Sequence, residues 1–156
     1  MNGAYWHLVV NHLPIIFPLI GAIVLITGLI AKSDAIKRTA FLIFTLGALA
    51  AIAAMTTGEG AENIAEKISG ITRSDIHKHE EAAETFAILA YVLGGISLLA
   101  LWASFKQKSF STIVTIATLI FAVALLFFAK QTGTTGGEIR HTEIRGNYPL
   151  PTSKKQ

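Results

Sequence analysis

Four stretches of this chain contain no charged residue, and they limit its fold more than any other feature. They cover residues 13–31, 39–57, 85–103 and 111–129, and each is 19 residues long. At a rise of about 1.5 Å per residue, a helix of that length extends roughly 28 Å, close to the hydrocarbon thickness of a bilayer. A helix also satisfies its backbone hydrogen bonds within the segment, as lipid requires. We therefore expect an all-α, integral membrane four-helix bundle.

The composition agrees with a membrane protein and excludes several kinds of site. Hydrophobic residues make up 52% of the chain and charged residues 15%, whereas a soluble domain has about 25% charged residues. The absence of cysteine excludes disulfides, thiolate metal sites and covalently attached c-type haem. The net charge of +3 is dispersed, so no basic patch indicates nucleic acid as a partner.

The connections between the four stretches are unequal in length. Residues 32–38 and 104–110 are short, which predicts two antiparallel helical hairpins. The connection between the hairpins, residues 58–84, is long and polar, and we expect a surface helix near 61–68. We therefore expect a bundle of two hairpins joined by a polar segment on one side of the membrane.

The first span has an uncertain start, and the chain has a distinct end. Pro14 and Pro18 predict either a kink in the first span, or a helix that begins near Gly3 and bends at both prolines. Residues 1–146 form one predicted transmembrane domain, and residues 147–156 form a predicted flexible tail. No small-residue cleavage site follows the first apolar run, so we do not expect a removable signal peptide.

The distribution of basic residues predicts the orientation. The two short connections contain one acid, Asp34, and five basic residues: Lys32, Lys37, Arg38, Lys106 and Lys108. Short loops rich in Lys and Arg stay on the cytoplasmic side. We therefore expect a multi-pass protein of the bacterial inner membrane, with both termini in the periplasm and membrane lipid around the spans.

All five histidines fall on one predicted side of the membrane. His7 and His12 precede the first span, His77 and His79 precede the third, and His141 follows the fourth. None lies in the short connections, so we expect the histidines to gather at the periplasmic end of the bundle.

An internal repeat accompanies the histidines. Each hairpin opens with a pair of them and closes with a glycine-rich segment that we expect to form a turn, TGEGAE at 57–62 and TGTTGGE at 132–138. Two like hairpins in the same orientation can pack about a pseudo-twofold axis along the membrane normal. Such an axis would bring His12 and His79 toward each other.

A neutral imidazole is a natural ligand for haem iron, copper or zinc. We interpret His12 and His79 as the axial ligands of a haem iron, with His7 and His141 as further cofactor-binding candidates. The plainer alternatives are that His7 is an amphipathic residue at headgroup level and that His77 lies on a solvated helix start beside acidic residues. No nucleophile–base pair stands out, so we expect no catalytic residue.

Three segments resemble a widespread bacterial family of small, four-helix predicted membrane proteins. They are HLVVNHLPI at 7–15, the His-Glu pair at 79–80 and GGEIRH at 136–141. This chain has Leu8 and Asn11 where the family pattern often has proline and valine. The resemblance covers almost the whole chain, and it implies a b-type cytochrome or a subunit of a respiratory assembly.

Two functions from different classes follow as expectations. The first is a membrane-bound protein or small respiratory subunit that carries haem b. It would transfer electrons between quinol, or other membrane-complex subunits, and a periplasmic electron carrier. The second is an accessory membrane subunit that binds copper or zinc through the histidines and Glu80, Glu84 or Glu138, or that has a purely structural role. In either case we expect a subunit more than a stand-alone enzyme.

Overall fold

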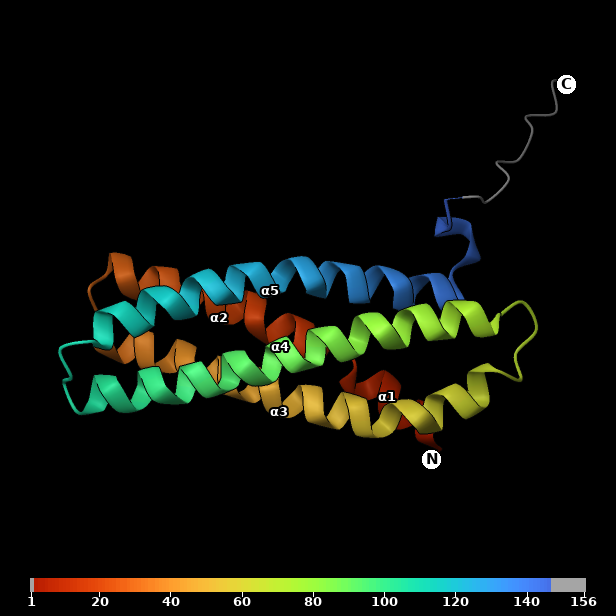
Figure 1. Cartoon of the computed structure of the whole chain (residues 1–156), viewed down its shortest axis with the longest axis horizontal. Coiled ribbons are helices and arrows are strands. Elements are labelled where there is room, and N and C mark those ends of the chain that lie inside the picture. Colours follow the sequence, from red (N-terminus) through yellow and green to blue (C-terminus); the bar gives the residue numbers. More distant parts are fainter. Residues whose placement is uncertain (1, 147–156) are drawn as a thin grey trace, which may run out of the picture.

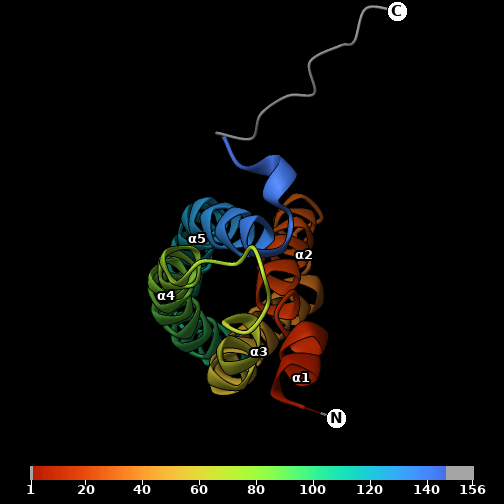
Figure 2. The same ribbon diagram turned by 90° about the vertical axis from the view of Figure 1, so that its right-hand side faces the viewer.

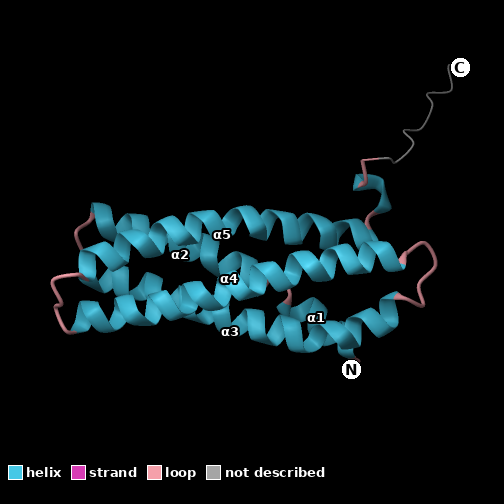
Figure 3. Ribbon diagram, viewed as in Figure 1, coloured by secondary structure: helices cyan, strands magenta, loops and turns pink. Residues whose placement is uncertain are grey.

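The computed structural model describes residues 2–146, which consist of helices and short connections (Figure 3). The elements are α1 (Gly3–Val10), α2 (Leu13–Ile30), α3 (Asp34–Ala65), α4 (Arg73–Phe105), α5 (Ser111–Arg140) and the 3₁₀ helix η1 (Thr142–Ile144). The predicted flexible tail, residues 147–156, lies outside the described residues.

Four long helices, α2 to α5, pack antiparallel around a common axis, and the short α1 lies outside this ring beside α3 (Figure 2). Helix α2 packs mainly on α3, and α5 packs mainly on α4. The four helical segments, with α1 and α2 taken together, are each long and apolar enough to cross a membrane. The predicted all-α bundle of two hairpins is confirmed, and the chain is a multi-pass membrane protein.

Alanine, leucine and phenylalanine side chains form the interior of the bundle, and other large apolar side chains cover its outside. Phe41 and Phe44 are almost fully buried, and the Phe44 ring packs on Gly21, where a Cβ atom would lie 2.6 Å from it. Ile113 and Phe127 are instead 71% and 70% exposed. In a membrane these outer side chains contact lipid, so the exposed apolar surface needs no protein partner.

Both hairpins turn in the same way. The turns contain Lys32 and Gln107, whose φ angles of 50° and 47° lie in the left-handed region. In each turn a backbone N–H donates to the carbonyl five residues earlier at 3.0 Å, from Ser33 to Gly28 and from Lys108 to Ala103. This hydrogen bond is part of the Schellman motif that commonly ends helices. The shared turn geometry supports the internal repeat.

The first span begins earlier than its charge-free stretch. Helix α1 starts at Gly3, and the chain breaks at Asn11 and His12 before α2 begins. Pro14 explains the break, because it has no N–H to donate and its ring disfavours a helical Val10 four residues earlier. Pro18 lies inside α2 without interrupting it.

The expected surface helix and glycine turns are wrong. Helix α3 continues without a break to Ala65, and α5 continues through its glycine-rich segment to Arg140. Two of these helical glycines make close contacts with neighbouring helices. A Cβ atom on Gly60 would lie 3.0 Å from the Gly3 Cα atom, and one on Gly136 would lie 2.9 Å from the His79 ring.

Candidate functional site: the histidine end of the bundle

The histidines gather at one end of the bundle, as the sequence predicts. This end comprises α1, the connection between α3 and α4, and the segment that follows α5 (Figure 1). The two tight turns with most of the basic connecting residues lie at the opposite end.

His7 on α1 is held by the facing surface of α3. Its Nδ1 atom lies 3.1 Å from the Ala54 carbonyl oxygen and 3.2 Å from Thr57 Oγ1. The Thr57 hydroxyl donates its own hydrogen to the Ala53 carbonyl at 2.8 Å. Both neighbours of Nδ1 therefore act as acceptors, which places the imidazole hydrogen on Nδ1. The Nε2 atom of neutral His7 is left with a free lone pair.

His79 on α4 is held in the same way by α5. Its Nδ1 atom lies 3.2 Å from Thr135 Oγ1. The Thr135 hydroxyl donates to carbonyl oxygens of its own helix, at 3.1 Å to Thr132 and 3.2 Å to Gln131. The imidazole hydrogen is therefore on Nδ1 here too, and Nε2 is free.

These contacts make the internal repeat a structural one. The threonine that contacts the imidazole, and the glycine that follows it, recur in both hairpins: Thr57 and Gly58 on α3, and Thr135 and Gly136 on α5. The sequence pattern placed Thr57 and Thr135 in expected glycine-rich turns and did not identify either threonine as a histidine partner. The repeated Thr and Gly residues were the signal that could have identified them.

His7, on α1, and His79, near the start of α4, both lie at this end of the bundle. Among the described residues, no hydrogen bond joins His79 to His7 or to His12. The expected axial pair of His12 and His79 therefore stays a prediction, and the hydrogen bonds favour His7 as the partner of His79.

The two remaining histidines are exposed and face carboxylates. His77 lies 3.7 Å from Glu80 and 3.3 Å from Glu81, on the helix face that its spacing predicts. His141 Nδ1 lies 2.9 Å from Glu143 Oε1. A hydrogen bond from its own backbone N–H, followed by the one from His141, holds the pKa of the Glu143 carboxyl below its ordinary value.

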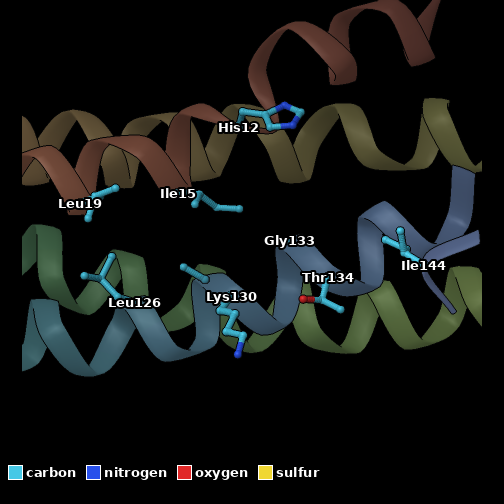
Figure 4. A pocket seen from close by; sticks show the side chains of 9 residues that line it. His12, Ile15, Leu19, Leu126, Lys130, Gly133, Thr134 and Ile144 are labelled. Atoms are coloured by element: carbon cyan, nitrogen blue, oxygen red, sulfur yellow. The ribbon is translucent and has the colours of Figure 1, made fainter. Parts of the chain in front are cut away.

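A pocket of about 640 Å³ opens between α2 and α5 near this end of the bundle. His12 and Ile15 lie on one side, and Leu126, Gly133 and Thr134 of α5 lie on the other (Figure 4). Its volume falls within the range of about 300–1,000 Å³ that is common for small-molecule sites. The structure therefore places His12 at a lipid-side pocket that His7 and His79 do not line.

The donor set limits which metal centres fit this end. In residues 2–146, no group of three or more His, Asp or Glu side chains is placed to hold a metal ion. A pair of imidazoles with free Nε2 atoms suits a centre that takes two protein ligands.

Comparison with known proteins does not assign the chain to a family. No family model, curated protein or solved structure matches the chain. What the sequence and structure share with the small four-helix family is therefore limited to four long apolar helices.

Proposed function

We propose that the protein is a membrane-bound b-type haem protein that transfers electrons, with His7 and His79 as the axial ligands. The observation that carries the proposal is the matched hydrogen bonding of the two imidazoles. Metal-ligating histidines almost always donate one ring N–H to a carbonyl or another oxygen, which fixes the ring and leaves the other nitrogen for the metal. His7 and His79 both have this arrangement.

The two imidazoles come from different hairpins, so His7 and His79 would hold a haem between the two halves of the bundle. When bound, haem supplies one-electron chemistry, and the chain's own residues hold and orient it. A noncovalent haem also agrees with a chain that has no cysteine.

The site lies at the end of the bundle that we expect to face the periplasm. We therefore propose that electrons pass between quinol or a membrane-complex partner and a periplasmic electron carrier. The axial pair of His12 and His79 is the competing assignment. The copper or zinc alternative has less support, because zinc sites in proteins use at least three protein ligands.

An absorption spectrum of the purified protein tests this function. Protein from haem-sufficient cells should show, after reduction, the Soret and α bands of a b-type haem. Acid acetone should extract the pigment, since no cysteine can tether it. A colourless preparation would contradict the proposal, and copper or zinc in stoichiometric amount would support the metal-binding alternative.

A further inference from the structure

The pocket between α2 and α5 has polar side chains in its outer half and apolar ones in its inner half, with Ile144 beyond the polar group (Figure 4). His12, in the break before α2, and Thr134, on α5, can both hydrogen-bond a ligand, and the charged Lys130 lines the same pocket. Leu19 and Leu126 line the inner end. His12 and Leu19 are separated by about 10 Å along a helix. This order suits an amphipathic molecule with a polar head toward the membrane surface and an apolar tail in the bilayer.

The two sides of the pocket come close together at one point. Gly133 faces Ile15 across the pocket, and a Cβ atom on Gly133 would lie 3.7 Å from the Ile15 Cδ1 atom. A polar atom next to His12 also has no partner. The Asn11 side-chain oxygen is buried at the α1–α2 break without a hydrogen bond among the described residues.

The pocket adjoins one of the proposed haem ligands through the chain. His12 follows His7 by five residues, at the break between α1 and α2. A redox-active molecule beside His12 would therefore sit near one of the two imidazoles. This neighbourhood favours a quinone over a phospholipid, because only the quinone can exchange electrons with a haem held by these histidines.

We propose that this pocket binds the head group of a lipid-soluble quinone, with its carbonyl oxygens beside His12 and Thr134 and its tail along Leu19 and Leu126. The inference deepens the proposed function by giving its quinol partner a site. It rests on that function for its purpose, but the binding itself requires no haem.

The test is an equilibrium binding measurement with decylubiquinone, a benzoquinone with a short apolar tail. The protein in detergent micelles is equilibrated with the quinone, and the bound amount is measured by solvent extraction after subtracting the uptake of empty micelles. We expect a single saturable site. Gly133→Leu should weaken binding about tenfold or more, because the new side chain fills the pocket.

Gly95→Leu is the matched control, since Gly95 is an exposed helical glycine with no heavy atom within 4 Å of an added Cβ. It should bind the quinone as the unaltered chain does. His12→Leu removes a polar contact without filling the pocket and should also weaken binding. If the Gly133→Leu variant loses its helical circular dichroism and cannot be interpreted, the binding measured for His12→Leu tests the inference instead.

Uptake that never saturates, or equal binding by the unaltered chain and both pocket variants, would overturn the inference. The inference would also be overturned if the unaltered protein bound no quinone saturably but carried a phospholipid that the Gly133→Leu variant lost. The two proposals fail separately. A colourless protein with saturable quinone binding refutes the haem alone, and a coloured protein without it refutes the pocket alone.

Discussion

The free Nε2 atoms of His7 and His79 each depend on a threonine whose hydroxyl hydrogen is already engaged. Thr57 and Thr135 donate to carbonyls of their own helices, so each can only accept from the imidazole. This is a common contact for a helical threonine, and here it also fixes a tautomer. Removing a hydroxyl should therefore affect cofactor affinity more than folding.

We expect Thr135→Val to lower haem affinity by about 10–100-fold, the usual effect of losing such a partner. Haem titration followed at the Soret band measures this affinity. Thr56→Val is the control, because Thr56 is exposed and bonds only to Ala53 of its own helix. Equal affinities in the two variants would mean that Thr135 does not position His79.

The equivalent glycines of the two hairpins should respond differently to alanine. A Cβ atom on Gly136 would lie 2.9 Å from His79 Cε1, whereas one on Gly58 would lie 4.0 Å from His7 Cε1. Gly136→Ala should therefore displace the His79 ring, at a cost in the range of about 1–3 kcal/mol for overpacking. Gly58→Ala should be neutral or stabilising, because alanine favours helix.

Thermal unfolding and the ferric haem spectrum together measure this difference. Gly136→Ala should lower both the melting temperature and the low-spin signal, and Gly58→Ala should preserve both. The same loss in both variants would show that contact with the ring is not the cause.

At the scale of elements, α1 is placed by a contact between two backbones. Gly3 and Gly60 approach so closely that a Cβ atom on Gly3 would lie 2.6 Å from the Gly60 Cα atom. This contact sets α1 on α3 and brings His7 to Ala54 and Thr57. The sequence did not predict it, because a glycine-rich polar segment fits a turn as well as a close helix contact.

Gly60→Leu should push α1 away from α3 and separate His7 from its two acceptors. We expect loss of low-spin haem with little change in helical circular dichroism, because α2 to α5 form the bundle without α1. Gly95→Leu, on a face with open space, serves as the control. Full haem occupancy in Gly60→Leu would show that the position of α1 does not matter for binding.

At the scale of the whole molecule, the spans and hairpins could be predicted from sequence because charge-free length and short connections determine them. The extent of the helices could not. Helix α4 has 33 residues, which corresponds to about 50 Å, against about 30 Å of hydrocarbon. Polar residues such as Glu62 and Glu80 are compatible with either a helix or a loop, and only the packing of the folded chain determines where each helix ends. The histidine end therefore extends beyond the membrane core.

The orientation of this end can be measured with single cysteines, since the chain has none of its own. Cysteines at Ser33 and Ser109, in the tight turns, should resist an impermeant thiol reagent in intact cells. A cysteine at Ser69, between α3 and α4, should react, because we expect that connection in the periplasm. The position Ser153, which offers the same test in the tail, lies outside the described residues. The reverse labelling pattern would place the histidine end in the cytoplasm.

The central claim is that His7 and His79 are the two ligands of one haem iron. It is tested most directly by the low-spin ferric signal, in electron paramagnetic resonance, of four single alanine variants. His7→Ala and His79→Ala should each abolish the signal, whereas His12→Ala and His77→Ala should retain it. Loss in His12→Ala and His79→Ala, with an unchanged His7→Ala, would contradict the claim and assign the axial pair to His12 and His79.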